Sequence, residues 1–267
     1  MIAPDDPFAA IKDKQRDAWS CFVPIEVFTA EPAAHLVRYA QIAAGQRVLD
    51  VGTGTGVVAV TAARMGASVT GLDLTPALLA RARENAALAE VAIAWEEGDA
   101  EALPFDDASF DVVVSQFGHM FAPRAEVATK EMLRVLKPGG TVAFSTWPRE
   151  HFVGRFFALL ARFTPPPPPG MSAPPAWGDV AVIEERLGSA VAGVRFERGV
   201  MRTNTLSLHH FGRMLEETIG PLRGFVGAGD ADAVARYRAE LRALAAEYFE
   251  DNCVLQHYLM TSATKRA

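Results

Sequence analysis

The chain has 267 residues, half of them hydrophobic, and a formal net charge of −6. This size and composition suit a single soluble α/β domain with a sizeable core. The negative charge argues against non-specific nucleic-acid binding, so we expect no nucleic-acid partner. No run approaches the ~20 apolar residues of a membrane span, and the N-terminus lacks the basic and apolar pattern of a secretory signal. Cys21 and Cys253 have neither disulfide nor metal-ligand spacing, which indicates reduced thiols in a cytoplasmic protein without stable membrane insertion.

The first 45 residues predict helices. Residues 6–20 form an amphipathic pattern with Phe8, Ile11 and Trp19 on the apolar side, and a second helix is expected over residues 32–43. We therefore expect residues 1–45 to form a helical segment ahead of the main domain.

The most informative segment is residues 47–56, an apolar run that ends in an acid and three alternate glycines. The run suits a buried strand, and residues 57–65 suit a helix that leaves the turn. Gly52, Gly54 and Gly56 carry no side chains, so backbone can approach a ligand closely. This strand, turn and helix predict a site for an adenosine-type cofactor.

Two cofactors compete for this turn. The glycines at 54 and 56, followed by Ala59, fit the dinucleotide fingerprint, so an NAD-dependent oxidoreductase remains an alternative. Asp50 disfavours NAD, because an anion at the strand end would repel a pyrophosphate and attract a cationic amino-acid group. S-adenosyl-L-methionine (SAM) carries an ammonium and a sulfonium and no phosphate. Asp50 therefore favours SAM.

The predicted second strand, residues 68–73, ends in Asp73, about 20 residues after the glycine turn. A carboxylate there can accept both ribose hydroxyls in charge-assisted hydrogen bonds. The alternative is a surface acid that caps the helix beginning near Thr75. NAD and SAM both carry this ribose, so Asp73 marks an adenosine without separating the two cofactors.

The predicted third strand, residues 91–95, is followed by Asp99. Its carboxylate can accept from the exocyclic amine of adenine, while the next backbone N–H, of Ala100, meets a ring nitrogen. Taken alone, Gly98 and Asp99 form an ordinary turn. Because the two preceding strands also end in acids at the expected spacing, we favour a role for Asp99 in the cofactor site.

The strand and helix alternation continues to residue 147 and predicts a doubly wound parallel sheet. A fourth strand is expected at residues 110–115, a helix at 125–136 and a fifth strand at 141–147. Between them, residues 137–140 predict a reversal, because proline cannot continue the helix and glycine permits the turn.

Beyond residue 147 the composition changes. A helix is expected at residues 151–163, and a proline run follows at 165–169. The run could be a stiff linker or an SH3-type ligand, but we favour an insertion, residues 148–190, that caps the substrate cavity. Residues 191–267 would complete the sheet, with strands at 195–205 and 252–264, the last antiparallel, and helices at 207–219 and 231–248.

Five segments in this order resemble those of the class I SAM-dependent methyltransferases, in the group typified by ubiquinone and menaquinone biosynthesis enzymes: 48–56, 69–73, 98–105, 110–115 and 133–141. The resemblance covers residues 46–147, the SAM-binding core. It implies a Rossmann-like α/β fold with seven strands, mostly parallel with an antiparallel last strand, and a helical cap insertion. It also implies N-terminal helices over the cofactor and S-adenosylhomocysteine (SAH) as product.

The resemblance further implies a role for each matching residue. Asp50 and Gly52 would hold the methionine ammonium, Asp73 the ribose, and Asp99 with Ala100 the adenine edge. The residues after the fourth strand would line the methionine side and the methyl-transfer channel. The full set of predicted cofactor residues is Asp50, Gly52, Thr53, Gly54, Gly56, Asp73, Leu74, Asp99, Ala100, Ser115, Gln116 and Phe117.

A sulfonium methyl is already activated, so the protein need only align a nucleophile and exclude water. Loss of positive charge in the transition state favours an apolar cavity, so we expect a small apolar or aromatic acceptor. Side chains that could wall the cavity, or simply pack in the core, are Phe117, Met120, Phe121, Trp147, Phe152, Phe156 and Trp177.

An oxygen nucleophile would need a base. His119 is the candidate, because it follows the fourth strand at the edge where open α/β sheets bind ligands. The alternative is a histidine that is hydrogen-bonded or faces solvent. No cluster has metal-ligand spacing, so we expect no metal. The oligomeric state is open between a monomer and a homodimer, and a non-catalytic SAM-binding protein remains an alternative to an enzyme.

Overall fold

The computed structural model describes residues 6–267, which include one mixed sheet in the order β3-β2-β1-β4-β5-β8-β6. Its strands are β1 (Arg47–Val51), β2 (Ser68–Asp73), β3 (Ala94–Glu97), β4 (Phe110–Gln116), β5 (Leu136–Thr146), β6 (Val191–Asn204), β7 (Phe249–Glu250) and β8 (Cys253–Lys265). Neighbours from β3 to β5 are parallel, and β8 is antiparallel to both β5 and β6. This confirms the predicted path of seven strands with an antiparallel last strand, to which the short β7 is added beside β8.

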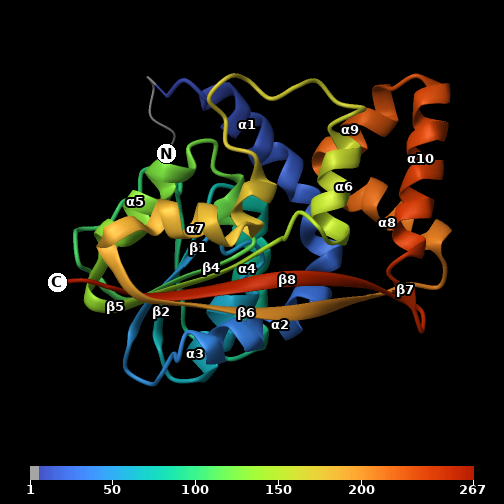
Figure 1. Cartoon of the computed structure of the whole chain (residues 1–267). Coiled ribbons are helices and arrows are strands. Elements are labelled where there is room, and N and C mark those ends of the chain that lie inside the picture. Colours follow the sequence, from blue (N-terminus) through green and yellow to red (C-terminus); the bar gives the residue numbers. More distant parts are fainter. Residues whose placement is uncertain (1–5) are drawn as a thin grey trace.

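Helices cover both faces of this sheet (Figure 1). Helices α2 (Glu26–Tyr39) and α3 (Val57–Arg64) lie on one face, and α5 (Ala125–Val135) and α7 (Val180–Leu187) lie on the other. Helix α4 (Pro76–Leu88) packs beside α3. Because both faces are covered, the central strands carry apolar residues on both sides: Val48 and Leu49 of β1 are fully buried, as is Val113 of β4.

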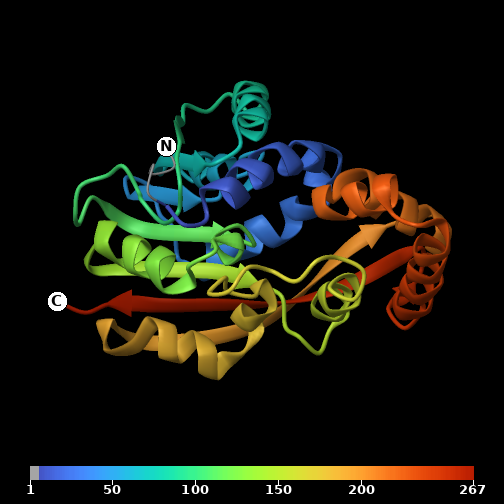
Figure 2. The same ribbon diagram turned by 90° about the horizontal axis from the view of Figure 1, so that it is seen from above.

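A helical cap stands at one end of the molecule, beyond the long strands β6 and β8 (Figures 1 and 2). It consists of α6 (Phe152–Leu160), α8 (Leu208–Thr218), α9 (Gly220–Ala228) and α10 (Ala231–Ala246). Phe152 of α6 meets Phe211 of α8 with ring centroids 5.4 Å apart. The cap therefore joins the segment after β5 to the C-terminal segment. Among residues 6–267, no helix combines the length and apolar character needed to cross a membrane.

The segment predicted as the cap insertion, residues 148–190, divides between two places. Its first helix, α6, packs in the cap, whereas α7 packs on α5 over the sheet. The proline run between them is exposed. Its far end is tied to the main domain, where the Ser172 N–H donates to the Pro123 carbonyl over 2.7 Å.

The N-terminal helix α1 (Ala9–Ala18) and the 3-10 helix η1 (Trp19–Ile25) lie between the main domain and the cap. Trp19 meets Phe121, which follows β4, with centroids 4.7 Å apart. On the cap side, a Cβ on Gly220 would lie 2.4 Å from the carbonyl oxygen of Ala18. The first segment of the chain thus contacts both parts of the molecule.

Several predicted boundaries are wrong. Helix α2 starts at Glu26 rather than residue 32 and contains Pro32, and β3 starts at Ala94 rather than residue 91. The predicted reversal at residues 137–140 is part of β5, because Leu136 already pairs with Phe110 before the register shifts. Helices α7 and α9 were not predicted. Each is short, and α9 contains three glycines, so neither has a strong helical signal.

The fold generates a stability prediction at Gly199 of β6. A Cβ there would lie 2.2 Å from Cζ of Tyr258, whose ring crosses this glycine from β8. Gly199→Ala should therefore lower the free energy of unfolding by about 1–3 kcal/mol, the usual cost of overpacking. Gly224→Ala is the matched control. Gly224 lies in α9, and a Cβ added there would have no atom within 4 Å, so alanine should stabilise the protein by about 0.5–1 kcal/mol.

Urea unfolding of both variants measures the two effects. The Tyr258→Leu background should remove most of the Gly199→Ala cost, because the ring atoms that cause the clash are gone. A Gly199→Ala protein as stable as the wild type would contradict this account of how β6 and β8 pack.

Candidate cofactor site

The predicted cofactor residues come together at one edge of the sheet. Strands β3, β2, β1 and β4 are neighbours and parallel, so their carboxyl ends share this edge. Asp73 ends β2, Asp99 follows β3, and Ser115 lies near the end of β4. Open α/β sheets bind ligands at such an edge.

The glycine turn is held against its neighbours. The Thr53 N–H donates to the Leu72 carbonyl over 2.9 Å, which fixes the turn to β2. Gly52 has a φ of 66°, and a Cβ there would lie 2.9 Å from the Cα of Gly118, in the segment after β4. A side chain at Gly52 is therefore excluded both by backbone conformation and by the close approach of a second backbone.

Asp50 is a buried carboxylate with hydrogen-bond donors at only one of its two oxygens in the described chain. It is 1% exposed, and its Oδ2 accepts from the Thr53 hydroxyl at 2.6 Å and from the Ala59 N–H at 3.1 Å. Its Oδ1 has no hydrogen-bond partner within residues 6–267. Burial raises the pKa of Asp50 from 3.8 to about 7, with the nearby Asp73 adding to the effect. A cationic group beside Oδ1 would satisfy this atom and restore the charged form.

Asp73 joins the glycine turn to the start of α4. Its Oδ2 accepts from the Gly54 N–H and its Oδ1 from the Thr75 N–H, both at 2.8 Å. The contact with Thr75 is the helix-start contact of the alternative interpretation, but the residue is only 8% exposed and is no surface acid. Burial raises the pKa of Asp73 despite these hydrogen bonds. Each carboxylate oxygen keeps a further lone pair for a ligand hydroxyl.

The last residues of β4 are tightly held, and the residue that follows them is strained. The Ser115 hydroxyl donates to the Val51 carbonyl over 2.6 Å, and the Gln116 side chain donates to the Thr29 carbonyl of α2. Phe117 has a φ of 59°, which is uncommon for a bulky residue. Its ring stacks on Trp147 with centroids 3.9 Å apart. This conformation holds an aromatic wall at the end of β4 and β5.

Asp99 is 4% exposed and both of its oxygens are engaged. Oδ1 accepts from the Glu101 N–H over 2.9 Å, and Oδ2 accepts from the Lys12 ammonium over 2.6 Å. Ala100 and Leu74, predicted to lie near the adenine, are half-buried.

The sequence predicted Asp99 as a site residue but did not predict its contact with Lys12. The available signal was a lysine one residue after Ile11, on the apolar side of the predicted first helix.

His119, the predicted base, is 1% exposed and lies between two aromatic rings. Its centroid is 4.7 Å from Phe144 and 4.5 Å from Trp177. In the described part of the chain neither ring nitrogen has a hydrogen-bond partner, so both expected alternatives, hydrogen-bonded or solvent-facing, are wrong. Burial lowers the pKa of His119 to about 3, with Arg186 as a second cause. The imidazole is a weak proton acceptor in this environment.

Six of the seven candidate wall residues separate into aromatic groups, and the seventh, Met120, is fully buried. Phe117 stacks on Trp147, while Trp177 packs with His119. Phe152 and Phe156 stack on each other in the cap, and the half-buried Phe121 meets Trp19 and Phe157. The Phe117 and Trp147 pair lies directly after the neighbouring strands β4 and β5.

Known proteins are similar to this chain in sequence and in fold. A family model described as a methyltransferase domain matches residues 48–140. An uncharacterized protein of Mycobacterium tuberculosis (strain ATCC 25618 / H37Rv) is 35% identical over 237 residues, which are 86% of this chain and 85% of that protein. The chain belongs to the class I SAM-dependent methyltransferases.

Two solved structures illustrate the shared fold. The YcgJ protein from Bacillus subtilis is similar with a TM-score of 0.61 and 19% identity, over 89% of this methyltransferase and 99% of that chain. Phosphoethanolamine N-methyltransferase 2 of Haemonchus contortus, solved with SAH, has a TM-score of 0.56 and 21% identity. That match covers 87% of this chain and 51% of the other.

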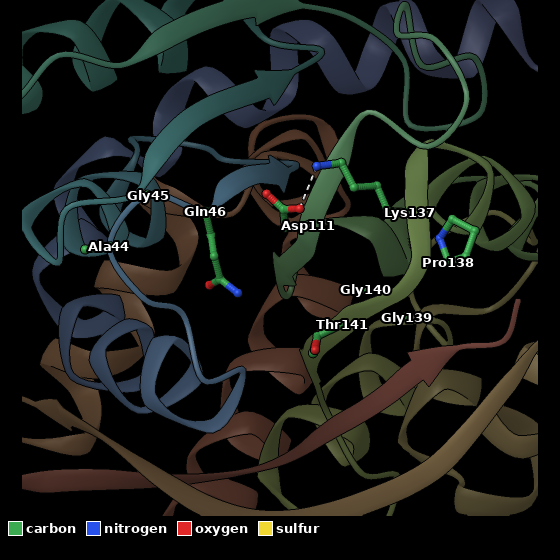
Figure 3. A pocket seen from close by; sticks show the side chains of 9 residues that line it. All are labelled: Ala44, Gly45, Gln46, Asp111, Lys137, Pro138, Gly139, Gly140 and Thr141. Carbon is green, nitrogen blue, oxygen red and sulfur yellow. Dashed lines mark hydrogen bonds and ion pairs between the residues drawn. The ribbon is translucent and has the colours of Figure 1, made fainter.

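A surface hollow of about 520 Å³ lies at the opposite edge of the methyltransferase sheet (Figure 3). It is lined by the residues before β1 and by the start of β5, around an ion pair of 2.6 Å between Lys137 and Asp111. These are the amino ends of the strands, whereas the predicted cofactor residues lie at the carboxyl ends. The hollow is therefore separate from the cofactor site.

The burial of Asp50 generates a pH-dependent prediction. Because its pKa is raised to about 7, the folded protein holds this proton more tightly than the unfolded chain. Its contribution to stability is fully present below about pH 4 and is lost as the pH rises through about 7. Asp50→Asn is neutral throughout, so its free energy of unfolding relative to wild type should rise between about pH 5 and pH 8. The expected rise is a few kcal/mol, at about 1.4 kcal/mol per pKa unit.

Chemical unfolding at both pH values measures this difference. Asp111→Asn is the control, because the hydrogen bond from Lys137 lowers the pKa of Asp111 and keeps it ionised over this range. The Asp111→Asn difference should be constant. A constant difference for Asp50→Asn as well would show that Asp50 is ionised in the folded protein.

Proposed function

We propose that this protein is an enzyme that transfers the methyl group of SAM to a small apolar or aromatic acceptor. The observation that carries the proposal is Asp50, a buried carboxylate with one oxygen left without a partner, among the described residues, at the glycine turn. A cofactor with a cationic amino-acid group satisfies that oxygen, whereas a pyrophosphate would be repelled by it. The position of the Asp50 carboxylate thus favours SAM over NAD, as the sequence pattern does.

The residues present fit such a cofactor. Asp50 and Gly52 would hold the methionine ammonium, and Asp73 would accept the ribose hydroxyls. Asp99 and the Ala100 N–H would meet the adenine edge, with Leu74 beside the ring. Ser115, Gln116 and Phe117 would lie along the methionine side, where the side-chain oxygen Oε1 of Gln116 is a second buried atom without a partner in the described chain.

SAM supplies a methyl group already activated on a sulfonium. The protein must align the acceptor with it and exclude water. The stack of Phe117 on Trp147 provides an apolar surface at the correct edge of the sheet. Half-buried Phe121 and Phe157 extend aromatic surface toward the cap. These contacts support an apolar or aromatic acceptor, and the net charge of −6 disfavours a nucleic acid.

His119 has no proton-transfer role in this proposal. Its lowered pKa makes it a poor base, and its ring is enclosed by Phe144 and Trp177. We further propose that the enzyme acts in the cytoplasm, because Cys21 and Cys253 are both free thiols.

Isothermal titration with SAM, SAH and NAD tests the cofactor, and transfer from methyl-labelled SAM to a panel of small aromatic and apolar acceptors tests the reaction. Binding of SAM and SAH without NAD, followed by labelled product, supports the proposal. Binding of NAD alone would overturn it. Tight SAM binding without transfer to any acceptor of the panel would favour a non-catalytic SAM-binding protein.

The proposal predicts a specific effect of Asp73→Ala. Loss of charge-assisted hydrogen bonds to the ribose should weaken SAM binding by about 1.5–3 kcal/mol. Asp179→Ala is the matched control, because Asp179 likewise accepts from a backbone N–H two residues on, that of Ala181 at the start of α7. Calorimetry should show unchanged SAM affinity for Asp179→Ala. Equal affinities for a folded Asp73→Ala protein and the wild type would remove Asp73 from the site.

A further inference from the structure

Helix α1 carries a lysine into the interior of the molecule. The Lys12 ammonium lies 2.5 Å from an oxygen of Asp6 and 2.6 Å from oxygens of Asp99 and Glu101. All four side chains are at most 6% exposed. A lysine has three N–H donors, and here each has a carboxylate acceptor.

Lys12 compensates part of the negative charge of this cluster. The three carboxylates offer oxygens within 4.8 Å of one another, a spacing that could suit a metal ion, but the ammonium takes the central position. Arg124 adds a second cation, with contacts of 3.0 Å to Asp6 and 2.7 Å to Glu101. Burial alone would lower the pKa of Lys12, but its hydrogen bonds to Asp6, Asp99 and Glu101 raise it above the ordinary value. Lys12 is therefore charged.

Lys12 also determines how Asp99 is oriented. The carboxylate is held at one oxygen by the Glu101 N–H, from its own loop, and at the other by Lys12, from a helix far away in the sequence. With both oxygens engaged, the carboxylate plane is fixed while lone pairs remain for a ligand. A second link, between Arg16 of α1 and Glu97 at the end of β3, holds the same helix beside the same loop.

We infer that Lys12 is a positioning residue that holds Asp99 oriented toward the purine, so that the site selects adenine over a purine with a carbonyl at C6. The inference rests on the proposed function, in which Asp99 accepts from the exocyclic amine. A carbonyl in place of that amine would face the carboxylate oxygen, and the protonated ring nitrogen of such a purine would face the Ala100 N–H. A site built to accept from an amine discriminates strongly against an analogue that lacks the donor.

The test compares the binding of SAH with that of S-inosylhomocysteine, which carries hypoxanthine in place of adenine. The wild type should bind SAH more tightly by at least about tenfold, the effect of one charge-assisted hydrogen bond. Lys12→Met keeps an unbranched side chain that is one atom shorter and removes its charge. It should weaken SAH binding by about tenfold and reduce the preference for adenine to within about threefold.

Two further variants keep the test informative. Lys14→Met is the matched control, because Lys14 lies on the same helix and is exposed, and it should keep the wild-type preference. If Lys12→Met fails to fold because three carboxylates face one another, Lys12→Met with Asp6→Asn removes one of these charges and still leaves Asp99 without its ammonium. The double variant should fold and lack the preference, whereas Asp6→Asn alone should retain it.

The outcomes separate this inference from the proposed function. A folded Lys12→Met or double variant with the wild-type ratio of the two affinities would overturn the role of Lys12 and leave SAM binding intact. A wild-type protein that binds neither SAH nor its inosine analogue would overturn the proposed function and this inference with it. Equal loss of affinity for both ligands, with an unchanged ratio, would mean that Lys12 only stabilises the fold.

Discussion

Three buried carboxylates lie at neighbouring strand ends, and the need to compensate their charge determines the structure of this edge of the sheet. A buried carboxylate is costly unless it is hydrogen-bonded or paired with a cation. The chain compensates Asp73 with two backbone N–H groups and Asp99 with the Lys12 ammonium. It leaves one oxygen of Asp50 without a partner in the described residues. This difference locates the position where a cationic ligand gains most.

Because Asp99 depends on Lys12, helix α1 is part of the charge balance of the main domain rather than a detachable cover. The same segment continues into η1, where Trp19 meets Phe121 and the Ala18 carbonyl lies against Gly220 of the cap. Cofactor edge, N-terminal helix and cap are thus in direct contact.

The sequence predicted the main domain well because its signals there are local. A strand that ends in an acid and glycines needs no distant partner, so β1, β2 and β4 appear almost at the predicted boundaries. The contents of the site were harder to predict, since they depend on packing. The role of Lys12 depends on contacts with acids that are distant in the sequence, and His119 was predicted as the candidate base because nothing local shows that two aromatic rings enclose it. Short helices such as α7 and α9 form for the same reason, through the surfaces on which they pack.

The aromatic surface beside the predicted cofactor residues is built from segments for which the sequence gives few local signals. Strand β8 enters between β5 and β6, which brings Tyr258 edge-on to Phe117 with centroids 5.9 Å apart. The Tyr258 hydroxyl is in turn 3.0 Å from the His35 ring of α2, so the left-handed backbone of Phe117 is supported by two elements outside the glycine-turn motif. Cofactor binding relies on backbone geometry that a short motif encodes, whereas the aromatic wall relies on side chains from α2, β5 and β8. Relatives that share the motif can therefore differ in this aromatic surface, because it depends on tertiary contacts rather than on the motif.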